Sequence, residues 1–587
     1  MKPALLLLVG SLFFYTSRAQ FYLRGEVKDE NNSLLPDVRI LLHSSGYLYH
    51  SGSSGAFGIP IPSSADTVTL SADGFQTLVM PVDANRYQFI KMRPVGGAAP
   101  SAPMRRGLLS LTKDVKAADR KDWTVGSETY SSLAENNFIP ALRFPETGFA
   151  VTIDKASYSN VRRFLNMGST IPPDAVRIEE LLNYFNFGYD DPPAGSCFTL
   201  RSRLSECPWN PGNRLLFLQV CARKIDPSRI PPANLVLLID ISGSMDLPNK
   251  LPLLKSAFGL LINNLRAIDT VSIVTYGSSV SVALQPTSGE NKKKILEAIN
   301  DLEPGGATPG EAGIRAAYRL AKSQLIKGGN NRVILATDGD FNEGETSEEE
   351  LARLVDQYKN WGVYLTCLGV GMGNYKDSKL EALAKKGNGN FAYLDEEQEA
   401  EKVLVREFTQ TVYAVADDVY LNIQFNPGLV KDYRLIGFDN KVKALSDTLS
   451  GLQGGEVGSG HSLLALFEIV PGDPDPSVVG RERLAEVLLN YRLPNERVAR
   501  TSSFDCSSRV IPFRELQPCY RFASSIALFG GLLKKSPFTR QADWKDAIEM
   551  AQSSVDPGDP MQEEFITLIE KARKIYGRNK HRRKDQY

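Results

Sequence analysis

The chain has 587 residues, with 68 lysines and arginines balanced by 68 aspartates and glutamates. A length of this order predicts three or four domains. Because the charges cancel, no net positive field would draw the chain to nucleic acid or to an anionic membrane, and we expect no nucleic-acid partner.

Residues 1–19 predict a signal peptide. Lys2 precedes an apolar stretch, and small residues lead to Ala19, after which we expect cleavage. No cysteine stands at that cleavage site, so a lipid anchor is not expected. No later apolar run reaches the roughly 20 residues of a membrane helix, and we interpret 523–533 as a buried helix. We therefore expect export, without a transmembrane segment in the mature chain, to the periplasm, the outer-envelope surface or the exterior.

Short alternating segments separated by turn residues predict a β-sandwich over residues 20–93. The clearest segments are 22–27, 37–42 and 68–70. The region resembles the carboxypeptidase-regulatory-like sandwich of exported bacterial proteins in four loose motifs: Gly25-x-Val27, Leu35-Pro36-Asp37-Val38, Gly55-x-Phe57 and Asp73-Gly74-Phe75. This resemblance implies a spacer or docking domain. Residues 94–125 mix Gly, Ala, Pro and charges without a period, which predicts a linker.

Two helices are predicted in residues 126–232, because apolar positions have helical spacing over 157–166 and 177–185. The runs 149–165 and 172–185 resemble the accessory region that precedes bacterial von Willebrand factor A domains of the YfbK type. No residue pattern in this region points to catalysis. We therefore expect the two helices to pack against neighbouring domains.

Strands and helices alternate over residues 233–410, which predicts a parallel, doubly wound (Rossmann-like) α/β sheet. The expected strands are Leu235–Asp240, Thr270–Tyr276, Val333–Thr337 and Tyr364–Gly369. The expected helices are Leu251–Leu265, Glu311–Leu325 and Glu348–Asn360. Sheets of this kind bind ligands outside the carboxyl ends of their strands, so we expect a site in the loops there.

Side chains that carry oxygen follow these buried strands. Asp240, Ser242 and Ser244 alternate along the loop after the first strand, Asp338 follows a second buried strand, and Thr308 opens a helical pattern. A carboxylate beside neutral oxygens favours a hard cation such as Mg²⁺ over zinc. The sequence therefore predicts a metal site at this edge of the sheet.

Each of these pieces has a simpler interpretation when it is taken alone. The stretch 240–244 could be a strand-to-helix turn with a capping residue. Thr308 followed by Pro309 is a good helix start, and Asp338–Gly339 could be a turn. The three pieces together, in this order and at these strand and helix ends, favour the metal site.

Asp-x-Ser-x-Ser, a distant threonine and a Thr-Asp-Gly strand end resemble the metal-ion-dependent adhesion site of von Willebrand factor A domains. The resemblance implies one divalent ion, usually Mg²⁺, with Mn²⁺ or Ca²⁺ as alternatives. It also implies an open coordination position for an acidic group of a partner. The metal residues implied by the motif are Asp240, Ser242, Ser244, Thr308 and Asp338.

An EF-hand calcium loop is the competing interpretation for the segment that begins at Asp338. Asp338, Asp340, Asn342 and Glu349 have the spacing of its ligands. However, Glu343 occupies the position of the turn glycine, and a strand rather than a helix comes before the loop. We therefore reject the EF-hand.

Residues 411–587 resemble the C-terminal region of the YfbK type. The expected strands are 419–425, 463–469 and 485–492, and the expected helices are 520–533, 544–553 and 561–576. Because strand-rich segments flank the A domain on both sides, we expect strands near 197–222 and 419–492 to pair in one β-domain that the A domain interrupts. The basic tail 578–584 is interpreted as a solvated terminus.

The six cysteines are expected to include a disulfide, because the chain is expected to be exported. Cys506 with Cys519 is the first candidate pair. Cys207 with Cys221 is the second, and Cys197 would serve equally well there. Cys367 lies in an apolar run and is expected to be a buried free thiol. A zinc or redox site is not expected, since the chain has no Cys-x-x-Cys and its four histidines are scattered.

These observations predict an exported, non-enzymatic protein-binding module for adhesion or envelope assembly. Its metal would capture an exposed Asp or Glu of a protein partner. Two alternatives stay open, a Mg²⁺-dependent hydrolase of phosphoesters and an envelope scaffold that does not use its metal. Against the hydrolase, the chain has no Gly-Lys dipeptide, no Gly-x-Ser-x-Gly elbow and no histidine in residues 233–410.

Overall fold

The computed structural model forms two compact units, Met1–Glu128 and Thr129–Tyr587. The described residues are 21–30, 32–35, 38–44, 48–51, 56–61, 63–95, 128–131, 135–151, 154–226, 230–306, 309–341, 347–359, 361–407, 413–438, 454–473, 482–494, 496 and 498–584. The predicted signal peptide and residues 96–125 of the predicted linker lie outside these ranges.

The first unit is a two-layer β-sandwich. Its strands are β1 (Phe21–Lys28), β2 (Arg39–Leu42), β3 (Leu48–His50), β4 (Ala56–Ile61), β5 (Ala65–Ser71), β6 (Leu78–Asp83) and β7 (Gln88–Lys91). One layer has the order β4-β1-β7 and the other the order β3-β2-β5-β6. Leu23 and Val27 of β1 share one core with Ile40 of β2 and Val68 of β5, so the two layers face each other. This confirms the expected β-sandwich.

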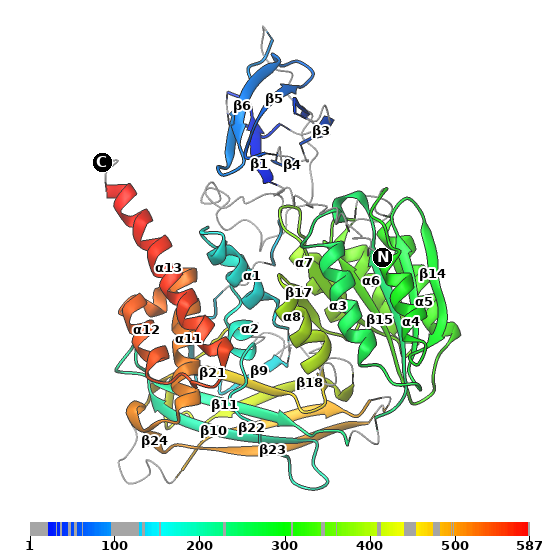
Figure 1. Ribbon diagram of the computed structural model, residues 1–587. Helices are drawn as coiled ribbons and strands as arrows, with labels where there is room; N and C mark the ends of the chain where they lie inside the picture. The colour runs from blue at the N-terminus through cyan, green and yellow to red at the C-terminus, as the bar shows by residue number, and fades with distance from the viewer. Residues whose placement is uncertain are drawn as a thin grey trace, which may run out of the picture. The chain divides into compact units, whose positions relative to one another are not determined.

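The second unit contains a larger β-sandwich (Figure 1). One sheet has the order β24-β10-β11-β21-β19-β8, and the other has the order β20-β18-β22-β23 with β9 paired to β18. Their bounds are β8 (Ile139–Pro140), β9 (Glu146–Ala150), β10 (Phe198–Glu206), β11 (Arg214–Ala222), β18 (Ala414–Phe425), β19 (Val430–Ile436), β20 (Gly455–Gly458), β21 (Ser462–Pro471), β22 (Arg483–Arg492), β23 (Ala499–Ser507) and β24 (Val510–Ile511). Leu218 and Phe467 of the first sheet share a core with Ile423 and Val487 of the second.

An α/β domain, residues 233–407, is inserted into this sandwich between β11 and β18. β11 pairs antiparallel with β21, with Leu218 opposite Ala465, although about 240 residues separate them in the chain. This confirms that strands on both sides of the insertion form one β-domain. Ser459 contacts both ends of the insertion, because its N–H donates to the Tyr413 carbonyl at 2.9 Å and its Oγ accepts from Ile225 N–H at 2.8 Å.

Helices pack against this sandwich and against one another, and those at 178–183 and 518–534 contact its six-stranded sheet. They are α1 (Ala156–Asn166), α2 (Ile178–Asn183), α11 (Pro518–Lys534), α12 (Trp544–Gln552) and α13 (Pro560–Lys584), with 3-10 turns η2 (Pro173–Ala175), η6 (Phe513–Glu515) and η7 (Pro537–Thr539). Phe217 of β11 contacts Tyr520 of α11, with ring centroids 5.2 Å apart. The expected buried helix at 523–533 is confirmed as part of α11. Among the residues that the structure describes, none of the helices has the length and apolar character that a membrane crossing requires.

The α/β domain has one six-stranded sheet with the order β14-β13-β12-β15-β16-β17. Its strands are β12 (Ala233–Asp240), β13 (Thr270–Tyr276), β14 (Val280–Ser288), β15 (Asn330–Thr337), β16 (Tyr364–Val370) and β17 (Phe391–Leu394). All neighbours are parallel except β14, which runs antiparallel to β13. This order confirms a doubly wound sheet, and the strands β14 and β17 were not predicted.

Helices cover both faces of this sheet. They are α3 (Leu251–Asn263), α4 (Lys292–Asn300), α5 (Gly310–Ser323), α6 (Glu348–Lys359), α7 (Asp377–Lys386) and α8 (Glu397–Glu401), with η4 (Gly243–Met245) and the π-helical turn η5 (Lys402–Arg406). Leu237 of β12 packs in one core with α3, and Leu238 packs in a separate core with α5. Successive residues of a strand face opposite sides, so the continuous apolar run of β12 is buried on both.

A buried ion-pair cluster joins α1 and α2 to the α/β domain. Arg177, just before α2, donates from Nη1 to Asp377 Oδ1 at 2.7 Å and from Nε to Glu180. Asn160 of α1 donates to the other Asp377 oxygen at 3.1 Å. Because Asp377 is the first residue of α7, this cluster fixes the start of that helix against the accessory helices.

A second buried pair joins the α/β sheet to the sandwich. Arg332 of β15 donates from Nη2 to Glu456 Oε1 at 2.6 Å and from Nη1 to Thr366 Oγ1 at 2.8 Å. Burial raises the pKa of Glu456 to about 7, although Arg332 lowers it, and the nearby Asp417 raises it further. Glu456 is therefore a group whose proton is bound more tightly in the folded state than in the unfolded chain.

Replacing Glu456 by glutamine is expected to flatten part of the pH dependence of stability. The ordinary pKa of this group is 4.5, so its stabilising contribution is complete below that pH and is lost as the pH rises to about 7. The thermal midpoint of the wild type should therefore fall more between about pH 5 and about pH 8 than that of Glu456→Gln. Glu496→Gln, the same change on a half-exposed carboxylate, is the control. If the thermal midpoints of the wild type and of Glu456→Gln fell equally over this pH range, the assigned role of Glu456 would be wrong.

All six cysteines have free thiols in the structure, so the expected disulfides are wrong. Cys506 lies on β23 and points into the sandwich core, whereas Cys519 lies in the first turn of α11. Cys207 directly follows β10, whereas Cys221 of β11 lies opposite Thr199, at the other end of the β10–β11 pair. Neither is bonded to Cys197. Cys367 is fully buried on β16, as expected for a free thiol in a core.

Candidate metal centre

The predicted residues Asp240 and Asp338 lie at the carboxyl ends of two adjacent parallel strands. Asp240 ends β12 and Asp338 follows β15, and the two strands are paired up to Ile239 opposite Ala336. The crossovers from these two strands pass to opposite faces of the sheet, so their loops part at this point and leave a place for a ligand. Both aspartates are fully buried, whereas Ser244 is exposed, so the centre reaches the surface at Ser244.

The two serine hydroxyls link the first loop to Asp338. Ser244 Oγ donates to Asp338 Oδ2 at 2.8 Å, and Ser242 Oγ lies 3.2 Å from Ser244 Oγ. Because the Ser244 proton goes to Asp338, Ser242 is the donor in the second contact. The structure therefore brings Ser242, Ser244 and Asp338 into one network with Asp240 beside them.

Asp240 is oriented by two hydrogen-bond donors, and its pKa is raised. Ser242 N–H donates to its Oδ1 at 2.9 Å, and Thr337 Oγ1 donates to its Oδ2 at 2.6 Å. Burial and the neighbouring Asp338 carboxylate raise the pKa of Asp240 to about 6. The raised value reflects burial first and the repulsion between the two carboxylates second.

Asp338 is surrounded by donors. Its Oδ2 accepts from Lys250 Nζ at 2.8 Å and from Asn374 Nδ2 at 2.9 Å, and its Oδ1 accepts from Asp340 N–H at 3.0 Å. Burial alone would raise the pKa of Asp338, but the Lys250 ammonium and these hydrogen bonds lower it below its ordinary value. Asp338 is therefore charged, and Lys250 is its closest counter-ion among the contacts described.

A glycine loop between α4 and α5 lies against the first loop. Gly305 N–H donates to the Ile241 carbonyl at 2.6 Å, and Gly243 N–H donates to the Gly306 carbonyl at 3.0 Å. Gly306 has a φ of +83°, in the left-handed region that favours glycine. Thr308, the fifth predicted metal residue, lies outside the described residues, but the backbone just before it is anchored beside Asp240 and Ser242.

Sequence reasoning missed three side chains that shape the centre: Thr337, Lys250 and Asn374. Thr337 could have been found, because a hydroxyl directly before Asp338 at a strand end is in reach of the neighbouring strand. Lys250 and Asn374 had no such signal, since they are 88 and 36 residues from Asp338 in the chain. Asp340 had no assigned role, and its Oδ2 accepts from Asn374 Nδ2 at 3.2 Å.

Three family models match the chain. The model described as von Willebrand factor type A domain matches residues 234–407. A model described as von Willebrand factor matches residues 124–217, and the C-terminal model of the uncharacterized protein YfbK matches residues 410–575. The uncharacterized protein YfbK of Escherichia coli strain K12 is 34% identical over 472 residues, which cover 76% of this chain and 81% of that protein.

The chain belongs to the YfbK family. The uncharacterized protein sll0103 of Synechocystis sp. is also similar, with 30% identity over 192 residues that cover 32% of this chain and 43% of that protein. Among solved structures, a von Willebrand factor type A protein from Catenulispora acidiphila is similar at 15% identity and a TM-score of 0.41, covering 66% of this chain and 91% of that one.

The donor set of this YfbK-family chain fits a hard divalent ion. Asp240, Ser242, Ser244 and Asp338 offer carboxylate and hydroxyl oxygens. The nitrogen atoms among their described contacts, such as Lys250 Nζ and Asn374 Nδ2, are hydrogen-bond donors and have no lone pair for a metal. In the described part of the chain, no group of three or more His, Cys, Asp or Glu side chains is arranged to hold a metal. An ion at Asp240 would therefore depend on hydroxyl oxygens and solvent as well as on two carboxylates.

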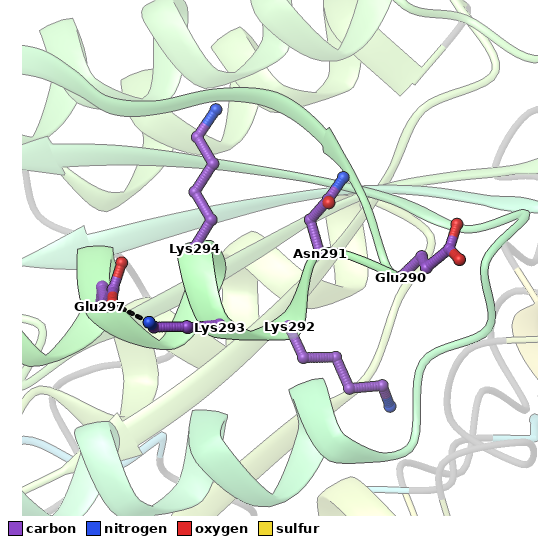
Figure 2. A pocket seen from close by; sticks show the side chains of 6 residues that line it. All are labelled: Glu290, Asn291, Lys292, Lys293, Lys294 and Glu297. Atoms are coloured by element: carbon purple, nitrogen blue, oxygen red, sulfur yellow. Dashed lines mark ion pairs between the residues drawn. The ribbon is translucent and has the colours of Figure 1, made fainter.

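A wide surface hollow of this YfbK-family protein lies away from the centre, at the start of α4 (Figure 2). Its lining residues are Glu290, Asn291, Lys292, Lys293, Lys294 and Glu297. Their charged ends diverge, apart from the Lys293–Glu297 ion pair at 3.8 Å. Lys292 Nζ donates to the Ile262 carbonyl at 3.2 Å, near the C-terminal end of α3. The N-terminal end of α3 follows Lys250 of the metal centre. A helix of 13 residues is roughly 20 Å long, so the hollow takes no part in the centre.

Proposed function

We propose that this protein is an exported, non-enzymatic binding module that captures an acidic group of a protein partner through a divalent metal ion. The observation that carries the proposal is the convergence of Asp240, Ser242, Ser244 and Asp338 at one point of the sheet edge, with Ser244 open to solvent. Mg²⁺ is the ion proposed, with Mn²⁺ or Ca²⁺ as alternatives, and Thr308 is proposed as a further ligand.

The chemistry of the centre supports the binding of a partner's carboxylate rather than catalysis. An ion held by two carboxylates and several neutral oxygens keeps enough positive charge to bind a further carboxylate, and such charge-assisted contacts are strong for their small area. The described groups that contact Asp240 and Asp338 are hydroxyls, amides and one ammonium, and no histidine is among them to act as a general base.

The location and the N-terminal unit complete the proposal. The apolar N-terminal stretch predicts export to the periplasm, the outer-envelope surface or the exterior, where a module for adhesion or envelope assembly would meet its partner. We further propose that the first β-sandwich is a carboxypeptidase-regulatory-like domain that serves as a spacer or a second docking surface. Its support is the four sequence motifs and the two-layer core around Leu23 and Ile40.

Replacing Asp240 by asparagine is expected to lower Mg²⁺ affinity at least about tenfold and to abolish metal-dependent partner capture, while the fold survives. The fold should survive because asparagine keeps an acceptor for Thr337 and relieves the repulsion from Asp338. Titration calorimetry with Mg²⁺ measures the affinity, circular dichroism checks the fold, and pull-downs with and without chelator measure capture.

Asp246→Asn is the matched control, because Asp246 is an exposed acid six residues further along the same loop. It should bind Mg²⁺ as the wild type does. The proposal fails if the wild type shows no Mg²⁺ binding, or if Asp240→Asn binds the ion as tightly as Asp246→Asn.

A further inference from the structure

Lys250 is a buried cation inside the candidate metal centre. It lies just before α3 and is 2% exposed. Its ammonium donates to Asp338 Oδ2 at 2.8 Å and to Asn374 Oδ1 at 3.0 Å. A buried lysine needs a partner to offset the loss of its hydration, and Asp338 is that partner.

The carboxylate oxygen that Lys250 contacts is shared with two other donors. Asp338 Oδ2 accepts from Ser244 Oγ at 2.8 Å and from Asn374 Nδ2 at 2.9 Å as well as from Lys250. Of these three donors, Lys250 carries a full positive charge. A metal ion that uses this oxygen must therefore displace a donor or share the oxygen with an ammonium.

The backbone makes room for the lysine. Gly371, in the loop between β16 and α7, has a φ of +83°, and a Cβ built there would lie 2.3 Å from Lys250 Cε. The carbonyl of Gly371 is held by Tyr393 Oη at 2.6 Å. The lysine stem thus lies in the space that a side chain at residue 371 would occupy.

We propose that Lys250 is a resident cation that weakens divalent metal binding and makes the loaded centre net positive. The inference rests on the proposed function of the same centre. The two carboxylates that would hold the ion, Asp240 and Asp338, leave one net negative charge with Lys250, and a divalent ion changes this to one net positive charge. Asp340 is not part of this sum, because its carboxylate contacts Asn374 rather than either of them. Like charges repel at short range in a poorly hydrated site, so the lysine lowers the affinity for the ion. The resulting positive centre attracts an acidic ligand more strongly than a neutral one would.

Lys250→Met tests the proposal by removing the charge while keeping most of the stem. We expect its Mg²⁺ affinity in titration calorimetry to be at least about tenfold higher than that of the wild type. Lys250→Gln, which keeps a hydrogen-bond donor without the charge, should show a gain of the same sign, and it replaces Lys250→Met if circular dichroism shows that the methionine variant is unfolded. Lys255→Met, five residues further along the chain in α3, is the matched control and should leave the affinity unchanged.

A second readout uses the metal-free protein. Without Mg²⁺, Lys250→Met should have a lower thermal midpoint than Lys255→Met, because Asp338 has lost its counter-ion, and added Mg²⁺ should raise its midpoint by a larger amount. The proposal is overturned if both Lys250 variants bind Mg²⁺ with the affinity of the wild type or more weakly. That result, combined with a tenfold loss in Asp240→Asn, would leave the proposed function standing. Absence of Mg²⁺ binding in the wild type and in every variant would overturn both.

Discussion

Replacing Arg177 by methionine is expected to lower the free energy of unfolding of the second unit by about 3–5 kcal/mol. Its guanidinium pairs with Asp377 at 2.7 Å, and the two side chains are 2% and 0% exposed. It also pairs with Glu180, so the variant would leave two buried carboxylates without their shared cation. Urea denaturation followed by tryptophan fluorescence measures the loss.

The matched control is Arg500→Met. Arg500 pairs with Glu496 at a comparable 2.9 Å, but these side chains are 46% and 43% exposed, so we expect a much smaller change than that of Arg177→Met. Adding Asp377→Asn to Arg177→Met should recover part of the loss, since it removes one uncompensated charge. Equal effects of Arg177→Met and Arg500→Met would show that the buried cluster does not hold α7 in place.

Replacing Gly306 by alanine is expected to lower Mg²⁺ affinity at least about tenfold and to reduce stability by about 1–3 kcal/mol. The residue has a φ of +83°, and a Cβ there would lie 2.2 Å from the backbone nitrogen of Ser278. Because backbone cannot rotate away as a side chain can, the glycine loop must shift. That shift would break the hydrogen bond from Gly243 N–H to the Gly306 carbonyl and move the segment that leads to Thr308.

Gly328→Ala separates the two causes. Gly328 also has a positive φ, +74°, but a Cβ there would have nothing within 4 Å. This variant should lose a similar amount of stability from the backbone conformation alone and keep its Mg²⁺ affinity. Calorimetry that finds equal Mg²⁺ affinity in Gly306→Ala and Gly328→Ala would mean that the position of the glycine loop does not matter for the ion.

The buried strands of the α/β domain could be predicted from sequence because their pattern is set locally. Thr270–Tyr276 was predicted with both ends correct, since its apolar run stops at Asp269 and Gly277. β14 was missed because only two of its nine residues are buried and its pairing with β13 has register shifts, which removes the two-residue period. β17 was missed because it has only four residues.

The candidate centre was predictable only in the part that the motif contains. Asp240, Ser242 and Ser244 form one short run, and Asp338 directly follows the strand that pairs with β12 in the doubly wound sheet. The surrounding charge was not predictable, because Lys250 and Asn374 reach Asp338 only through the packing of α3 and of the loop before α7.

The cysteine prediction failed for a related reason. Closeness in sequence suggested that Cys506 and Cys519 would be bonded. The chain between them includes β24 and the turn η6, which take Cys519 to the start of a helix while Cys506 stays in a core. A disulfide requires the two Cα atoms within about 7 Å, and this depends on the fold rather than on the number of intervening residues.

The contact of both ends of the insertion with Ser459 has a practical consequence for engineering. The chain leaves the sandwich near Ile225 and returns near Tyr413, both beside Ser459, so the two host strands have adjacent ends at the junction. A short glycine-serine bridge in its place should close without stretching either strand. An unrelated domain with adjacent termini would fit the same junction only together with apolar replacements for Arg177 and Glu456, whose buried partners lie in the insert.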